Sequence, residues 1–202
     1  MKPASLVSAC ALAALAVLNA GCVALPMQVY VSDGAQGSPV YERCSFNPEV
    51  PLGVKLEQAG VHAIISVVQH RDHALVGVRF DVPRGTTLVL RENTIKVDAR
   101  DGVAPRVAPF PNVNPAAPAL FPESPAIQKL VLPVDTPLRG DTSRMGNTSY
   151  DRHYWIAAPL QGLLAPEVWV TLPEFATDSG PSGFPEVHFI KRFVIGQALF
   201  NC

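Results

Sequence analysis

Residues 61–97 read VHAIISVVQHRDHALVGVRFDVPRGTTLVLRENTIKV, and this stretch decides the fold. Apolar side chains alternate with polar or small ones through residues 74–82. Because side chains of a strand point to opposite faces with a period of two, the alternation predicts a half-buried β-strand. Pro83-Arg84-Gly85 predicts a turn after that strand, and residues 86–90 predict a second strand.

The same signals extend in both directions from this stretch. Residues 61–69 predict a strand that joins the central one through a polar hairpin tip at residues 70–73. Further strands are predicted at residues 51–56, 127–134, 167–172 and 186–195, whereas residues 138–153 are polar and predict a loop. We therefore expect about seven to nine short strands separated by turns. This pattern predicts an all-β protein, built as a single β-sandwich.

A proline-rich stretch interrupts the strand pattern. Seven prolines lie between Pro105 and Pro125. A strand inside a sheet does not hold that density of missing N–H donors. We expect a long, extended connection over the surface, and we expect it to form a contact surface together with residues 138–153.

Composition limits the classes of function. The 202 residues are 48% apolar and 16% charged, with a formal net charge of −1. A packed core is therefore expected. No basic block is present, which argues against nucleic acid as a partner.

The N-terminus has the pattern of an export signal. Lys2 precedes an apolar run at residues 9–18, and small residues follow it, as in a secretory signal peptide. The run is too short to span a bilayer, which takes about 20 residues. Ala20-Gly21-Cys22 resembles the lipobox of bacterial lipoproteins, although Asn19 stands where that motif usually has an aliphatic residue. We expect a signal peptide at 1–21, a lipidated Cys22 with a tether at 22–37, and a domain at 38–202.

Two other outcomes for the N-terminus follow from the same residues. Ordinary cleavage, after Ala20 or Ala24 for example, would release a soluble periplasmic or secreted protein. If Cys22 is lipidated, the resemblance to bacterial lipoproteins implies the outer membrane, facing the periplasm, because Val23 rather than Asp follows it.

The remaining cysteines fit an oxidising compartment. Cys10 lies in the signal peptide, which leaves Cys44 and Cys202 as a pair. We expect a disulfide between them; the alternatives are two free thiols or a bridge from Cys202 to another molecule.

Few residue clusters suggest chemistry, so no catalytic residue, metal ligand or cofactor is predicted. His70 and His73 flank Asp72 and could bind a metal with a fourth group, but a solvated turn is the expected state. Ser149, Asp151 and His153 have the residue types of a hydrolase triad, without a nucleophile elbow around the serine. Tyr154, Trp155 and Trp169 could line a sugar or peptide site, or could pack in the sheets.

The repeated pattern of a strand, a Val-Pro or Leu-Pro pair and a Gly-containing turn occurs at Val82-Pro83 and Leu172-Pro173. It resembles immunoglobulin-like domains of uncharacterised bacterial envelope proteins, which implies an immunoglobulin-like β-sandwich and carries no catalytic residues over. The leading hypothesis is a non-enzymatic, lipid-anchored envelope protein that acts through contacts with other envelope proteins. A ligand-binding module for a sugar or peptide is the alternative, followed by a hydrolase or metal enzyme.

Overall fold

The computed structural model describes residues 24–41, 49–113, 132–140, 143–145, 148–150 and 152–197. These residues form strands and turns and contain no helix. The strands are β1 (Ala24–Ser32), β2 (Ser38–Val40), β3 (Gly53–Gln58), β4 (Val61–Gln69), β5 (His73–Val82), β6 (Thr87–Leu90), β7 (Thr94–Asp98), β8 (Arg106–Pro109), β9 (Leu138–Arg139), β10 (Ser143–Met145), β11 (Thr148–Tyr150), β12 (Arg152–Gln161), β13 (Glu167–Thr171), β14 (Phe175–Thr177), β15 (Gly180–Ser182) and β16 (Val187–Gln197).

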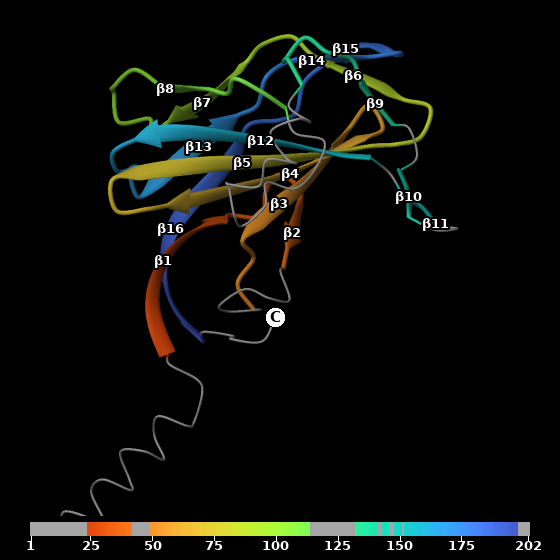
Figure 1. The fold of residues 1–202 in the computed structure, drawn as a ribbon. Helices are drawn as coiled ribbons and strands as arrows, with labels where there is room; N and C mark the ends of the chain where they lie inside the picture. The colour runs from red at the N-terminus through yellow and green to blue at the C-terminus, as the bar shows by residue number, and fades with distance from the viewer. Residues whose placement is uncertain are drawn as a thin grey trace, which may run out of the picture.

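Two five-stranded antiparallel sheets form the body of the protein. One has the order β1-β16-β13-β7-β8 and the other the order β12-β5-β4-β3-β2. They lie as two layers, and a smaller sheet of order β15-β14-β6-β9 lies at one end of them (Figure 1). The all-β, sandwich-like architecture predicted from the strand pattern is confirmed.

The central hairpin has the predicted alternation. In β5, the five apolar residues on one face are buried, and they are Ala74, Val76, Val78, Phe80 and Val82. β5 pairs with β4 on one side and with β12 on the other, so that Val78 lies opposite both Ile65 and Ile156. The same alternation in all three strands directs one face of the sheet into the core.

The core is one continuous cluster that takes residues from both large sheets. Its largest fully buried side chains include Tyr30 from β1, Phe80 from β5 and Phe189 from β16. Since these strands are far apart in the chain, the core joins the first described strand to the last. Such burial is the main stabilising contribution to a domain of this size.

Residues 138–153 were predicted to be a loop, and that prediction is wrong for much of the segment. Leu138 is fully buried in β9, β10 pairs with β11, and β12 begins at Arg152. Gly140, which follows β9, lies tightly against the turn after β5, because a Cβ on Gly140 would stand 1.7 Å from the carbonyl oxygen of Pro83. The segment is largely polar, and β10 and β11 have three residues each, so no period of two can be recognised in them.

The proline-rich stretch also begins differently from the prediction. Its first residues form β8, which pairs with β7 and lies at the edge of its sheet. An edge strand tolerates proline, since one of its sides needs no N–H donors. Residues 114–131, which contain most of the stretch, lie outside the described residues.

Several expectations fall wholly or partly outside the described residues. The signal peptide, Cys22, Cys44 and Cys202 lie there, as does most of the predicted strand at 127–134. Within the range 22–37, residues 24–32 form β1, which pairs along its whole length with β16. In the part of the chain that the structure describes, no helix has the length and apolar character needed to cross a membrane.

Candidate functional site

The predicted hairpin tip at residues 70–73 is confirmed as a tight turn. The amide of His70 donates to the carbonyl oxygen of His73 at 2.8 Å, and the two imidazole rings stack with centroids 4.5 Å apart. His73 hydrogen-bonds Asp72 at 2.7 Å, which lowers the pKa of that carboxyl below its usual value. Nowhere in the described residues do three His, Cys, Asp or Glu side chains gather as a metal site would need.

His153, a member of the hypothesised triad, lies beside a different carboxylate. Its Nδ1 is 2.6 Å from Oδ1 of Asp81, which lies directly across from it on β5. The same carboxylate accepts two hydrogen bonds from the guanidinium of Arg79 at 2.8 and 3.1 Å. Asp81 is therefore held between Arg79 and His153 as part of the sheet. The side chains of Ser149 and Asp151 lie outside the described residues.

The aromatic residues singled out as ligand platforms have their faces occupied within the protein. The ring of Trp169 stacks on His188 with centroids 4.3 Å apart, and the guanidinium of Arg100 lies 4.2 Å from the indole centroid. Tyr154 is buried and donates its hydroxyl to the carbonyl oxygen of Arg139. Arg79 lies 5.5 Å from the indole centroid of Trp155.

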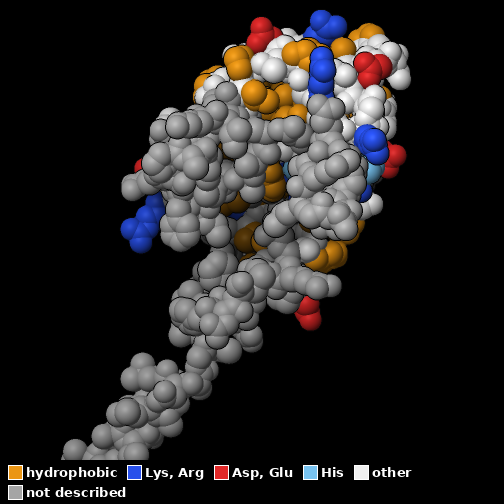
Figure 2. All heavy atoms as spheres, turned by 45° about the vertical axis from the view of Figure 1, so that its right-hand side comes forward, with side chains coloured by type: hydrophobic (Ala, Val, Ile, Leu, Met, Phe, Trp, Pro, Cys, Tyr) orange, Lys and Arg blue, Asp and Glu red, His pale blue; other side chains and the backbone are white. Residues whose placement is uncertain are grey.

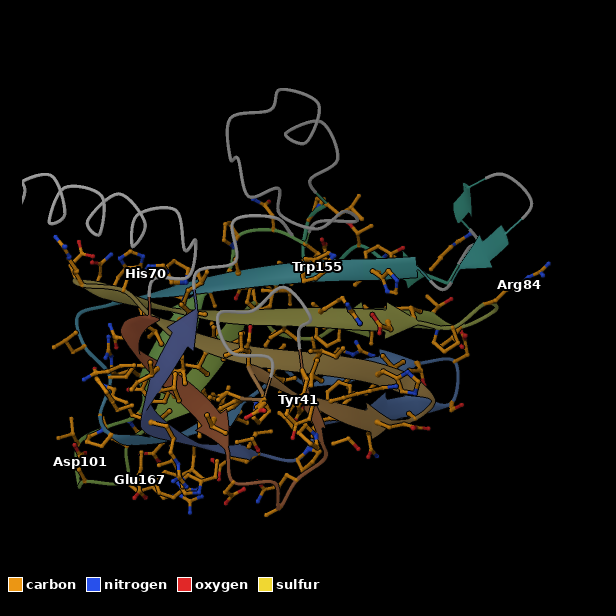
Figure 3. All side chains as sticks on the ribbon, turned by 90° about the horizontal axis from the view of Figure 1, so that it is seen from below. Tyr41, His70, Arg84, Asp101, Trp155 and Glu167 are labelled. Atoms are coloured by element: carbon orange, nitrogen blue, oxygen red, sulfur yellow. The ribbon has the colours of Figure 1, made fainter. Side chains whose placement is uncertain are left out.

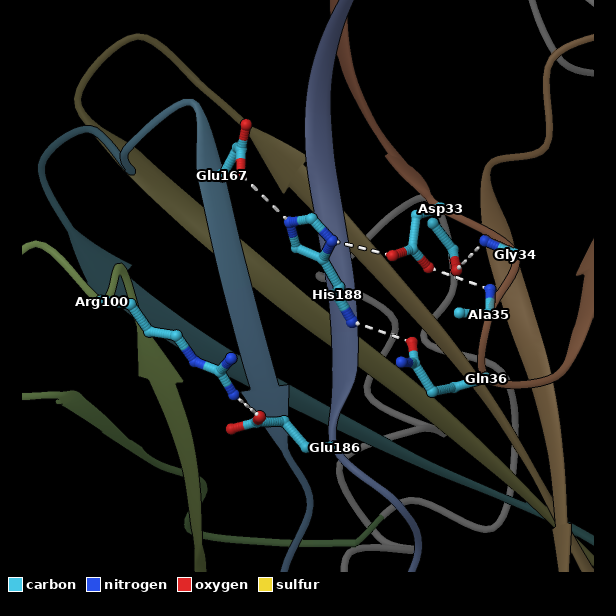
Figure 4. Close-up of polar contacts among 9 residues, drawn as sticks. Asp33, Gly34, Ala35, Gln36, Arg100, Glu167, Glu186 and His188 are labelled. Atoms are coloured by element: carbon cyan, nitrogen blue, oxygen red, sulfur yellow. Dashed lines mark hydrogen bonds and ion pairs between the residues drawn. The ribbon is translucent and has the colours of Figure 1, made fainter.

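A polar network extends the Trp169 stack over the outer face of its sheet (Figure 4). His188 Nδ1 is 2.9 Å from Asp33, and its Nε2 is 3.4 Å from Glu167 at ion-pair distance without hydrogen-bond geometry. Arg100 pairs with Glu186 on the same face. Each of these polar side chains lies within hydrogen-bond or ion-pair distance of another member of the network, so this face is a structural surface more than a ligand site.

Another part of the protein has the features of a binding site: residues 161–166, which comprise the last residue of β12 and the loop from it to β13, and which we call the 161–166 loop. Its main-chain carbonyl groups accept hydrogen bonds from three distant elements. The guanidinium of Arg106 donates to Gln161 and, at 3.0 Å, to Leu163, while Nζ of Lys191 donates to Leu164 at 3.2 Å. Loops with this density of long-range bonds are held in one conformation.

Two further bonds complete the hold on the loop. The hydroxyl of Tyr30 donates to Ala165 at 2.7 Å, and the amide of Lys191 donates to Pro166 at 2.7 Å. Burial raises the pKa of Tyr30 to about 12, and nearby Arg106 opposes that rise only in part. The hydroxyl therefore keeps its proton and its donor role at neutral pH.

The 161–166 loop presents an apolar tip beside a small pocket. Leu163 is 65% exposed, and Val103 from the loop between β7 and β8 is 69% exposed. Both line a pocket of about 140 Å³, which we call the loop-end pocket. Its lining is Val97, Ala99, Asp101, Val103, Ala104, Arg106, Leu163, Leu164, Ala165 and Val168.

The loop-end pocket lies at the end of the sandwich where several connections meet. Figure 3 shows His70, Asp101 and Glu167 at this end and Arg84 at the opposite end. The pocket wall is mostly apolar, with Asp101 and Arg106 as its charged members. A volume near 150 Å³ holds one benzene-sized group, so the pocket has room for a single large apolar side chain.

Sequence reasoning did not single out the loop-end pocket. The available signal was Gly162-Leu163-Leu164-Ala165, an apolar run between a glycine and Pro166 in a predicted connection. Large apolar residues in a connection need a packing partner or an external one, which is the signal that could have found the site. Comparisons with protein-family models, with curated proteins and with solved structures find no match to this chain.

Proposed function

We propose that this protein is a non-enzymatic, lipid-anchored protein of the bacterial cell envelope that binds another envelope protein at the loop-end pocket. The observation that carries the proposal is the 161–166 loop, whose carbonyl groups are held by Arg106, Lys191 and Tyr30 while Leu163 stays exposed. Several long-range hydrogen bonds thus fix one surface loop that exposes an apolar side chain.

Rigidity of that kind favours binding. A preorganised site avoids the entropic cost of ordering its side chains when the partner arrives, which is about 0.5–1.5 kcal/mol for each mobile one. Apolar side chains in a small pocket at the centre of a contact typically contribute most of the affinity. We therefore expect the partner to insert one apolar side chain between Val103 and Leu163.

Charge also favours a protein partner. Lys, Arg, Asp and Glu side chains are interspersed on the face that Figure 2 presents, with no broad region of one sign. The described residues on this face thus form no basic surface suited to nucleic acid.

The anchor and the finer fold assignment belong to the same proposal. The lipobox-like Ala20-Gly21-Cys22 supports lipidation of Cys22 and placement at the outer membrane, and a Cys44–Cys202 disulfide suits that compartment. Two layers of antiparallel strands support an immunoglobulin-like sandwich, from which the β2-β3-β4-β5 meander departs.

Site-specific photo-crosslinking in the envelope of the protein's own host tests the function. A photoreactive residue at Leu163 should give a discrete adduct with one envelope protein, and Val103→Asp in the same chain should abolish that adduct. The matched control is the photoreactive residue at Val107, which is 52% exposed on β8 and does not line the pocket. Equal adducts at Leu163 and Val107, or an adduct unaffected by Val103→Asp, would refute the pocket as the contact.

A further inference from the structure

A two-stranded ribbon projects from the sandwich where β1 pairs with β16. β13 pairs with β16 only from Val187 to Ile190, so the residues of β16 from Lys191 onward have β1 as their paired neighbour. The ribbon extends away from the body of the protein (Figure 1). We call this part the β1/β16 ribbon.

One face of the β1/β16 ribbon continues the core-facing side of its sheet. Val187 and Phe189 are fully buried, and the next apolar residues of the same alternation are Phe193 and Ile195. Phe193 is 68% exposed and Ile195 is 65% exposed. Exposed large apolar side chains side by side on a projecting element mark a contact surface.

The position of the ribbon in the chain identifies what it contacts. β1 begins at Ala24, two residues after Cys22. Ile195 lies opposite Pro26, so at most about 14 Å of extended chain separates a lipidated Cys22 from that position. Lipid chains on Cys22 would therefore hold this end of the ribbon near the surface of the bilayer.

The orientation of the ribbon follows from the depth of the membrane interface. The headgroup layer is roughly 5–8 Å deep on each side of the hydrocarbon core. With the chain between Cys22 and β1 extended, an upright ribbon would raise both apolar side chains above the headgroups into water, whereas a ribbon lying along the surface places both in the interface. Burial of apolar area favours the second arrangement.

We propose that Phe193 and Ile195 of the β1/β16 ribbon insert into the bilayer interface and lay the ribbon along the membrane. This inference rests on the lipid anchor of the proposed function. It does not depend on the loop-end pocket or on the identity of its partner.

Tryptophan scanning of the lipidated full-length mature chain in vesicles tests the inference. The vesicles consist of phosphatidylethanolamine and phosphatidylglycerol, with or without bromine on the acyl chains, which quenches only tryptophan in contact with lipid. Phe193→Trp and Ile195→Trp each add one fluorophore on the ribbon face, and Val107→Trp is the matched control. The parent chain gives the constant signal of Trp155 and Trp169.

The expected result is a blue-shifted emission that brominated lipid quenches for Phe193→Trp and Ile195→Trp, and an unquenched emission for Val107→Trp. If the chain floats with the vesicles and neither ribbon position is quenched more than Val107→Trp, the inference is overturned while the anchor stands. If the chain carries no lipid on Cys22 by intact mass and does not float, the anchor fails and the inference with it.

Discussion

Tyr30 allows a quantitative test of how the 161–166 loop is held. Its ring is buried in the core, and its hydroxyl donates to Ala165 at 2.7 Å. The perturbation is twofold: the Tyr30→Phe variant removes the donor at every pH, and alkaline pH removes the proton in the parent protein alone. The two proteins should therefore differ in opposite directions at neutral and at high pH.

The magnitudes follow from the hydrogen bond and from the shifted pKa. At pH 8 the lost hydrogen bond should make Tyr30→Phe less stable by about 1 kcal/mol. The pKa of Tyr30 is raised from 10.0 to about 12 in the folded protein. A raised pKa contributes stability that is fully present below the unfolded value and is lost as pH rises through the folded value. Two pKa units correspond to about 2.7 kcal/mol, which is more than the hydrogen bond contributes. The parent therefore loses its advantage over Tyr30→Phe as the pH rises between the unfolded and the folded pKa, and the two free energies of unfolding should cross at about pH 11.

Urea unfolding of both proteins between pH 8 and pH 12 measures this difference directly. Subtracting one protein from the other cancels the titration of the groups they share. Absorbance at 295 nm of the folded proteins gives the second readout, as one tyrosine in the parent should titrate late and that transition should be missing in Tyr30→Phe. A Tyr30 that titrates near 10, or a stability difference that does not change with pH, would refute the buried donor.

Two further predictions concern the turn at β9 and the acidic end of the pH range. Gly140→Ala should lower the free energy of unfolding by more than about 3 kcal/mol, because its Cβ would meet the carbonyl oxygen of Pro83, whereas Gly183→Ala, with no atom within 4 Å, should change it by less than about 0.5 kcal/mol in the same urea titration. The amide of Ala35, and after it the side chain of His188, lower the pKa of Asp33. The ionised carboxylate therefore stabilises the fold above the usual aspartate pKa, and this contribution is lost as the pH falls through the lowered pKa. The midpoint of thermal unfolding of Asp33→Asn should differ from that of the parent at pH 7 and converge with it in acid.

The strands that could be predicted are those in which buried and exposed residues alternate over many positions. β4 and β5 each bury alternate residues over nine or ten positions, so their apolar pattern alone indicates both the strand and its inner face. β10 and β11 have three residues each, which is too short for a period to be recognised. They are strands because they pair with each other, and the apolar pattern of neither segment alone indicates that pairing.

The hold on the 161–166 loop could not be predicted for a related reason. Its donors come from Tyr30, Arg106 and Lys191, which are separated from their acceptors by 135, 57 and 27 residues for the bonds to Ala165, Leu163 and Leu164. Each donor is unremarkable in its own stretch of sequence. Only the sheet order, with β1 beside β16 and β16 beside β13, brings Tyr30 and Lys191 to the same loop.

Lys191 joins the two surfaces proposed here. Its main-chain amide and its Nζ both bind carbonyl groups of the 161–166 loop, and it is also the residue at which β16 leaves β13. Because the ribbon begins at the same residue that holds the loop, the loop-end pocket has a fixed position relative to the β1/β16 ribbon. If the ribbon lies along the membrane, the pocket has a fixed height and direction above the lipid. A partner that reaches it must then present its apolar side chain from one direction relative to the membrane, so the two proposed contacts together fix the orientation in which the partner is bound.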